Sequence, residues 1–305
     1  MKTASLWIKR LLVGLLGLAG LAGLAAAALV AGAHFGERKM QRHVEVPVAA
    51  VALREDAASV SRGRYLFLSR GCTECHGTNG AGREFINDGK GMRVRAPNIT
   101  PGAGSAVAGY GADDWTRTIR HGVKPDGHPA LIMPSEDYNR LTDDDLASLV
   151  AYLRRMPAVD APGALLQLPL PVKALYAAGV VRDAAEKIDH HQPPSTPVPD
   201  APTAVHGAYV ANACIGCHGA NLSGGKIPGA PPDWPAAANL TPAPGGALAR
   251  YPDEKAFAEM LRSGRRPDGS AVSLVMPFIA LKELNDTDVQ ALYLHLKSLP
   301  AAAGG

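Results

Sequence analysis

The stretch Cys72-Thr73-Glu74-Cys75-His76 has two cysteines that are separated by two residues and followed directly by a histidine. This C-x-x-C-H pattern is the attachment signature of a c-type haem. Two cysteines one helical turn apart can bond the two vinyl groups of one porphyrin, and the next histidine can bind the iron. The pattern recurs at Cys214-Ile215-Gly216-Cys217-His218, and the two copies contain all 4 cysteines of the chain. The sequence therefore predicts two covalently bound haem c groups.

Two other kinds of site also use C-x-x-C pairs. Such a pair can be a redox-active dithiol, and two pairs together can form a four-cysteine zinc site. Here Cys72 and Cys214 lie 142 positions apart, and each pair has its own adjacent histidine. A dithiol of the thioredoxin type would also need a β-α-β pattern, of which the sequence shows little sign. Haem attachment accounts for the cysteines and the histidines together.

The composition bounds the class of protein. The chain has 305 residues, of which 5% are aromatic, with 33 glycines and 25 prolines. So few large side chains form a sparse core, and two buried porphyrins would supply the missing apolar mass, so we expect folding to depend on the cofactor. A net charge of +3, with no basic stripe, argues against nucleic acid as a partner.

Residues 1–44 are expected to form a membrane anchor and its flank. Residues 11–33 contain no charged side chain. As a helix they would span about 34 Å, which is enough for a bilayer core of about 30 Å. The alternative is a cleaved signal peptide ending at Ala31-Gly32-Ala33, but the apolar region of such a peptide is normally about 7–15 residues long. We favour a single-pass inner-membrane helix. The rest of the chain should lie in the periplasm, because haem is attached outside the bacterial cytoplasm.

The chain contains two copies of one domain, residues 45–157 and 203–305. Many positions match at offsets between 141 and 143, which is too regular for chance. The matched positions include two Asn-x-Thr-Pro stretches, a Gly-containing stretch, a Met-Pro pair and a leucine series: Asn98 and Asn239, Thr100 and Thr241, Arg120 and Arg262, Gly122 and Gly264, Met133 and Met276, Leu153 and Leu296.

Each copy is expected to be an all-α fold of short helices joined by long loops. Helices are predicted at 62–70 and 205–213 before the cysteines, and at 113–121 and 253–263, which end at glycines. The final helix of each copy carries an apolar stripe, and it begins after the capping residues Thr142 and Asn285.

Residues 158–202 form the linker between the copies. Its second half is rich in proline, which predicts a stiff, extended chain. Its first half, around 165–176, is too apolar for a free tether, and we expect it to pack on a domain. His190 and His191 are interpreted as a solvated or locally bonded pair rather than as metal or haem ligands.

Methionine sulfur is the predicted second iron ligand in both copies. Such a ligand raises the reduction potential of the haem. Of the 7 methionines, only Met133 and Met276 match each other in the repeat, and each precedes a proline. The others lie outside the repeat or match another residue type, and we expect them to pack or stay uninvolved: Met1, Met40, Met92, Met156 and Met260.

With these motifs the chain resembles the class I cytochromes c, and more closely the membrane-anchored bacterial dihaem cytochromes c. The resemblance covers about residues 60–157 and 203–300. Similar domains form the cytochrome subunits of membrane-bound alcohol and gluconate dehydrogenases, which usually carry three haems where this chain has two motifs. The resemblance implies that one set of polar side chains lies near the haem propionates, unless these residues only fix turns: Asn98, Thr100, Asn239 and Thr241, with Arg120 and Arg262 as further candidates.

The expected function is electron transfer without substrate chemistry of its own. Electrons would come from a dehydrogenase or a quinol-linked donor and pass to a terminal oxidase or a soluble carrier. The first alternative is a dihaem peroxidase, which must leave one iron open to peroxide. The second is a permanent subunit of a dehydrogenase complex, which differs from a free carrier only in the lifetime of the contact.

Overall fold

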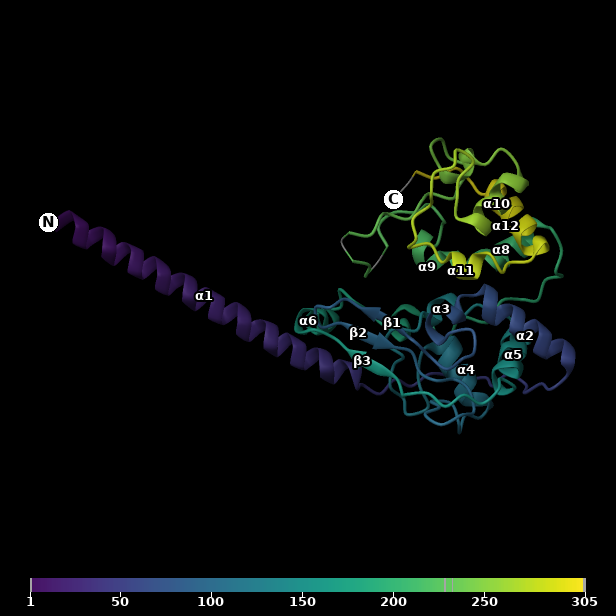
Figure 1. Ribbon diagram of the computed structural model, residues 1–305, viewed down its shortest axis with the longest axis horizontal. Helices are drawn as coiled ribbons and strands as arrows, with labels where there is room; N and C mark the ends of the chain where they lie inside the picture. The colour runs from purple at the N-terminus through teal and green to yellow at the C-terminus, as the bar shows by residue number, and fades with distance from the viewer. Residues whose placement is uncertain (1, 228, 232, 304–305) are drawn as a thin grey trace.

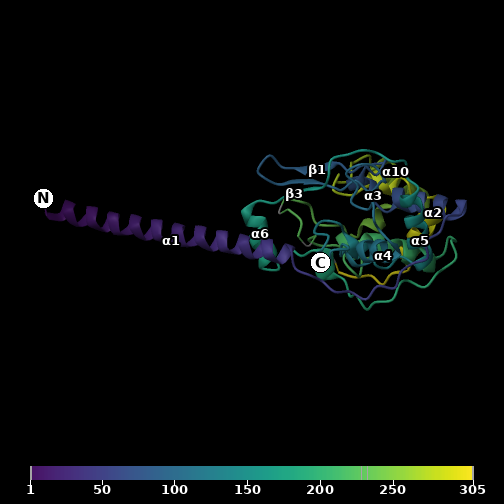
Figure 2. The same cartoon turned by 90° about the horizontal axis from the view of Figure 1, so that it is seen from below.

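The structure is a computed structural model that describes residues 2–227, 229–231 and 233–303. A long helix, α1 (Lys2–Met40), projects away from two helical units that stack against each other, and both views show this arrangement (Figure 1, Figure 2). The first unit contains α2 (Ala57–Ser69), α3 (Cys72–His76), α4 (Ala112–His121), the short 3-10 helix η1 (Ser135–Asp137) and α5 (Asp143–Arg154). The second contains α8 (Ala204–Val210), η2 (Ala211–Cys214), α9 (Ile215–His218), η3 (Ala247–Arg250), α10 (Glu254–Ser263), α11 (Phe278–Leu281) and α12 (Asp286–Ser298).

The helix ends agree with the predicted signals. The Thr142 hydroxyl accepts a hydrogen bond from the Asp145 amide at 3.0 Å, and the Asn285 side chain accepts one from the Asp288 amide at 2.7 Å. These bonds satisfy amides that a helix start leaves without partners. Helices α4 and α10 both end at a left-handed glycine, Gly122 or Gly264, with φ of 65° and 70°.

In each unit the first helix crosses the last helix at a glycine. A Cβ atom at Gly63 of α2 would overlap the carbonyl oxygen of Ser148 in α5. A Cβ atom at Gly207 of α8 would overlap the carbonyl oxygen of Ala291 in α12 in the same way. Only glycine allows the two backbones to approach so closely. The shared contact is direct structural evidence of the repeat.

Each unit has its own hydrophobic core. The first is built on α2 and α5 around Leu66, Phe67, Leu146 and Val150, all of which are fully buried. The second is built on α10 and α12 and includes Leu261, Val289 and Leu296. The predicted leucine stripes of the final helices therefore face the two cores.

The fold is mostly helical, but it also contains a small antiparallel sheet that we did not predict. Strand β2 (Arg93–Arg95) lies between β1 (Glu84–Asn87) and β3 (Leu165–Gln167). The strands have three or four residues, which is too short for the alternating pattern that identifies a strand in a sequence. The all-α description is therefore incomplete at this edge of the first unit.

The first half of the linker packs, as predicted. It supplies β3 to the sheet and continues into α6 (Leu170–Ala177), which lies against the end of α1, and then into α7 (Ala184–Lys187). Small residues allow the contact between α1 and α6, since a Cβ at Gly36 would overlap the Lys173 carbonyl oxygen. The Lys39 ammonium donates to the Tyr176 carbonyl oxygen at 2.9 Å. Residues 192–202, the proline-rich part of the linker, form no helix or strand.

The glycine crossings give a first prediction. Gly63→Ala and Gly207→Ala should each lower the free energy of unfolding by roughly 1–3 kcal/mol, because the added methyl group forces the two helices apart. Denaturant unfolding of the haem-loaded protein measures this loss. Gly163→Ala is the control, because a Cβ at Gly163 has no neighbour within 4 Å. Equal stability of all three variants would contradict the close crossing.

Candidate functional site

The two motif histidines make the same hydrogen bond in their respective units. His76 Nδ1 lies 3.1 Å from the Pro97 carbonyl oxygen, and His218 Nδ1 lies 2.8 Å from the Ala238 carbonyl oxygen. A ring that donates through Nδ1 presents Nε2 as its metal ligand. Burial also lowers the pKa of both histidines below the usual value, which favours the neutral ring that binds a metal.

The Asn-x-Thr-Pro stretches hold the carbonyl groups that orient these histidines. Asn98 Oδ1 accepts hydrogen bonds from the Thr100 amide at 2.9 Å and from its hydroxyl at 2.8 Å. Asn239 makes the same two bonds with Thr241, at the same distances.

The same asparagines also tie this turn to the chain beyond the last helix. Asn98 Nδ2 donates to the Val159 carbonyl oxygen at 2.7 Å, and Asn239 Nδ2 donates to the Ala302 carbonyl oxygen at 2.8 Å. A turn-fixing role is thus visible for both pairs of Asn and Thr. Contact of these side chains with a haem propionate stays a prediction.

Arg120 and Arg262 hold the start of the final helix in each unit. The Arg120 guanidinium donates to Asp143 at 2.8 Å and to the Leu141 carbonyl oxygen at 2.9 Å. The Arg262 guanidinium donates to Asp286 at 2.8 Å and to the Leu284 carbonyl oxygen. The matched bonds give both arginines a structural role, and a propionate contact stays a prediction for them as well.

The four cysteines form no disulfide bonds, and their setting does not suit dithiol chemistry. Burial raises the pKa of Cys72 to about 12, of Cys75 to about 11 and of Cys214 to about 12. A reactive dithiol has a lowered pKa instead. Among the residues that the structure describes, no three His, Cys, Asp or Glu side chains are grouped so that they could hold a metal ion.

Met133 and Met276 occupy equivalent places. Each is half-buried and packs against the core of its unit, as does the first cysteine of its motif. Each carbonyl oxygen accepts a hydrogen bond, at 2.9 Å in both copies, from the amide two residues later: Ser135 in the first and Phe278 in the second. Met156 and Met260 are buried within the cores, which agrees with the packing role expected for them.

A cavity in the second unit brings the predicted residues together. It has a volume of about 320 Å³ and is lined by Cys214, His218, Asn239 and Met276 among mainly apolar side chains. The predicted thioether-forming Cys214, the predicted iron ligand Met276 and the motif histidine His218 thus line one apolar space. This donor set and lining fit a haem whose flat face is apolar.

The interface between the units is built from reciprocal hydrogen bonds. The Tyr65 hydroxyl in α2 donates to Asp288 Oδ2 in α12 at 2.6 Å. The Tyr209 hydroxyl in α8 donates to Asp145 Oδ2 in α5, also at 2.6 Å. The two tyrosines match in the repeat, as do the two aspartates, so each unit gives the other the same bond.

Each of these aspartates is also bound within its own unit. Asp145 accepts two hydrogen bonds from Arg62, at 2.8 and 3.0 Å, and Asp288 lies 2.7 Å from His206 Nε2. Asp288 also accepts a hydrogen bond across the interface, at 3.0 Å, from the buried Arg70 guanidinium of the first unit. Burial raises the pKa of both carboxyl groups, but these cationic partners outweigh it and hold each pKa below the usual value.

The two C-x-x-C-H helices lie at this interface (Figure 1). The Asp137 carboxylate of the first unit faces the amide of Gly216 in the second motif. The Glu74 carboxylate of the first motif faces the amide of Ala280 in α11. Burial raises the pKa of Asp137 to about 7. Each motif is therefore in contact with the segment that follows the other unit's Met-Pro pair.

The sequence motifs described above do not include two Gly-x-Tyr stretches, Gly63-Arg64-Tyr65 and Gly207-Ala208-Tyr209, that shape the two units. The glycines permit the helix crossings, and the tyrosines make the reciprocal bonds between the units. The signal was present in the repeat, since Tyr65 with Tyr209 and Asp145 with Asp288 are matched pairs of hydrogen-bonding residues.

Comparisons with known proteins agree with this geometry. Residues 58–153 match the family model described as cytochrome c oxidase, cbb3-type, subunit III, and residues 204–300 match the family model described as cytochrome c. The chain therefore carries two cytochrome c domains, with two covalently bound haem c groups, and is an electron-transfer protein rather than an enzyme in its own right.

Three curated relatives extend the comparison. The chain is 30% identical over 276 residues to the fructose dehydrogenase cytochrome subunit of Gluconobacter japonicus, covering 80% of this chain and 53% of that protein. It is 28% identical over 287 residues to the gluconate 2-dehydrogenase cytochrome c subunit of Pantoea cypripedii, covering 82% and 62%. It is 26% identical over 272 residues to a diheme cytochrome c-type protein of Cereibacter sphaeroides, covering 79% and 86%.

The chain spans a little over half the length of the two dehydrogenase cytochrome subunits, but most of the length of the diheme protein. These likenesses and the two family matches make the chain a dihaem cytochrome c, similar to the cytochrome subunits of membrane dehydrogenases.

The buried carboxylate of Asp288 gives a second prediction. Asp288→Asn should lower the free energy of unfolding by about 3–5 kcal/mol at pH 7, because it leaves the buried Arg70 guanidinium without its counter-charge. The folded-state pKa of Asp288 lies below 3.8, so its stabilising effect is complete above about pH 4 and is lost as the pH falls through the folded-state value.

Denaturant unfolding at pH 7 and pH 3 measures both effects. Asp286→Asn is the control, because its carboxylate sits on the same helix with its side chain 96% exposed. The gap in stability between wild type and Asp288→Asn should narrow at pH 3. A gap that stays constant from pH 7 to pH 3 would rule out an ionised Asp288 as the source of the effect.

Proposed function

We propose that this dihaem cytochrome is a membrane-held electron carrier. It would take electrons from a dehydrogenase or a quinol-linked donor and pass them to a terminal oxidase or a soluble acceptor. The observation that carries the proposal is the equivalence of the two sites: His76 and Met133 recur as His218 and Met276 in the same local turns. Each haem supplies a one-electron couple between ferric and ferrous iron.

The protein side chains of the proposed sites would hold, orient and close each haem. Hydrogen bonds from Nδ1 to the carbonyl oxygens of Pro97 and Ala238 orient the histidine rings. Met133 and Met276, each on a stiff Met-Pro turn, would supply the sixth ligand. A haem iron has two positions beyond the porphyrin nitrogens. If protein side chains fill both, no position is left for a substrate, and the haem can only transfer electrons.

Domain boundaries follow from the same equivalence. We assign the first haem domain to residues 45–157 and the second to residues 203–305, with 158–202 as the linker between them. The interface supports electron passage from one haem to the other, because each C-x-x-C-H helix lies against the opposite unit.

A cytochrome subunit of a membrane dehydrogenase is the more specific form of this proposal. The relatives named as cytochrome subunits of fructose and gluconate dehydrogenases favour a dehydrogenase as the donor. A dihaem peroxidase is the weaker candidate, since it needs one open iron whereas both units here present the same Met-Pro turn.

The anchor supports a location at the inner membrane with the haem domains in the periplasm. Within α1, the segment Trp7–Met40 is long and apolar enough to cross a membrane, and its apolar side chains are exposed. The helix continues past the possible cleavage site to Met40, and Ala33 is buried against the rest of the chain. This packing favours an uncleaved helix, and attachment of haem outside the cytoplasm would place its amino terminus in the cytoplasm.

The ligand assignment gives a third prediction. Met133→Ala should open the first haem to carbon monoxide and lower its reduction potential, because a soft sulfur donor that favours ferrous iron is lost. Met276→Ala should do the same at the second haem. Optical titration with carbon monoxide counts the open sites, and potentiometric titration gives the potentials.

Met92→Ala is the matched control and should change neither haem. Carbon monoxide binding at one haem of the wild-type protein, or rapid turnover of peroxide, would remove one methionine from the ligand set and favour the peroxidase.

The anchor gives a fourth prediction. The mature protein should fractionate with membranes and keep its amino terminus near Met1, because the uncharged segment supplies enough length to cross the bilayer. Amino-terminal sequencing of the membrane fraction measures this. A soluble mature form that begins at His34 would identify the segment as a signal peptide.

A further inference from the structure

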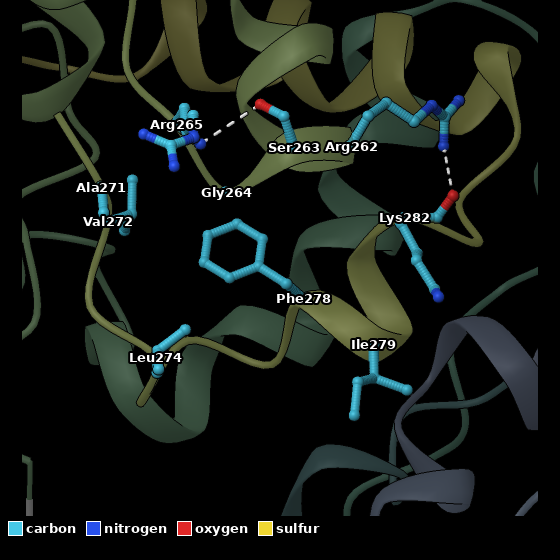
Figure 3. Close-up of a pocket in the computed structure, with 10 residues that line it drawn as sticks. All are labelled: Arg262, Ser263, Gly264, Arg265, Ala271, Val272, Leu274, Phe278, Ile279 and Lys282. Atoms are coloured by element: carbon cyan, nitrogen blue, oxygen red, sulfur yellow. Dashed lines mark hydrogen bonds between the residues drawn. The ribbon is translucent and has the colours of Figure 1, made fainter. Parts of the chain in front are cut away.

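The second unit has an open apolar groove beside its Met-Pro turn. The groove has a volume of about 340 Å³ and lies between the end of α10 and the start of α11 (Figure 3). The Phe278 ring points into its middle, and Leu274 and Ile279 form its edge. The Leu274 side chain is 93% exposed and Ile279 is 48% exposed. Two exposed apolar side chains next to the Phe278 ring make this groove a candidate contact site.

The equivalent surface of the first unit is covered by the chain's own linker. The register is fixed by matched bridges, Val123 with Pro129 and Arg265 with Ala271. At Gly122, which matches Gly264, a Cβ would lie 3.0 Å from the Ala184 side chain of α7. Val123 is fully buried there, whereas its counterpart Arg265 is exposed.

Polar contacts hold that linker segment in place. Lys187 of α7 pairs with Glu136 of η1 at 2.6 Å, and His190 lies 3.1 Å from His121 at the end of α4. Ala184, Ala185 and Ile188 are buried. The segment that fills this groove in the first unit thus combines small apolar side chains with one charge that pairs with the groove wall.

The groove of the second unit is lined by positively charged side chains, whereas the equivalent surface of the first unit carries the acidic Glu136. Ile279 stands where the first unit has Glu136, Lys282 stands where it has Asn139, and Arg265 stands where it has Val123. None of the ten residues that line the groove is acidic. Arg262 is paired with Asp286, but within the described part of the chain the Lys282 ammonium has no ion pair. A linker-like segment that carried a lysine would be repelled here.

We propose that this groove is the docking site of an electron-transfer partner protein, which inserts a short segment of small apolar side chains bearing carboxylates. Apolar side chains would cover Leu274, Phe278 and Ile279, and carboxylates would pair with Arg265 and Lys282. The site lies beside Met276, so docking there would bring the partner next to the second haem. The inference rests on the proposed carrier function and adds which face the partner uses.

The test uses the full-length holoprotein in detergent and a flavodoxin hydroquinone as an acidic one-electron donor. One electron leaves the flavodoxin, which becomes the semiquinone, and reduces one ferric haem. The double variant Arg265→Glu/Lys282→Glu should lower the second-order rate constant at low salt at least about tenfold, and added salt should no longer slow the reaction.

Lys255→Glu/Lys297→Glu is the control, since it makes the same change in net charge at two exposed lysines of the same unit, away from the groove. Ile279→Ser should lower the rate constant while leaving its salt dependence intact, because it removes apolar contact only. The potentials of both haems are measured in all three variants and the rate constants are compared at equal driving force, because negative charge added near a haem lowers its potential.

Three results would overturn the docking site. The groove variant could react as fast as wild type, or the control could lose as much rate as the groove variant. Sedimentation could also show that wild type dimerises and the groove variant does not, in which case a second copy of the chain occupies the groove. Failure of the carrier function itself would look different, since wild type would then accept no electron from the flavodoxin at all.

Discussion

Two buried aspartates connect the parts of this protein. Asp145 and Asp288 each lie in the first turn of a final helix. Within its own unit, Asp145 binds an arginine and Asp288 binds a histidine. Each aspartate also accepts a hydrogen bond from a tyrosine hydroxyl of the other unit. Removing a carboxylate from water is costly unless several donors compensate. Only one arrangement of the two units supplies all these donors, so the aspartates fix how the units face each other.

The repeat makes the two haem sites alike, and the additions to it make the two units different. Both sites use a carbonyl group held by an Asn-Thr pair to orient the histidine. The first unit is then covered by segments that come from outside the repeat: β3 extends its sheet and α7 fills the groove next to its Met-Pro turn. The second unit keeps that groove open and surrounds it with cations. The same fold thus occurs once with this groove covered by the protein's own chain and once with the groove open to the proposed partner.

Much of this could be predicted from the sequence, because the decisive features are local. The C-x-x-C-H motifs, the helix caps at Thr142 and Asn285 and the glycine stops are short patterns with a direct physical cause. The sheet could not be predicted, because strands of three or four residues carry no periodic signal. The repeat marks Tyr65 and Asp288 as members of matched pairs, but it does not show that these two residues bind each other or that the linker covers Gly122. These contacts depend on how distant segments pack, and spacing along the chain does not encode that.

Reciprocal hydrogen bonds hold the two haem domains in a single arrangement. Pulsed electron paramagnetic resonance between the two low-spin ferric irons measures it directly, because the method reports the distribution of distances as well as the mean. We expect one narrow distribution in the wild-type protein, and a broad one once Tyr65→Phe and Tyr209→Phe are combined. A broad distribution in the wild type, or no change in the double variant, would contradict it.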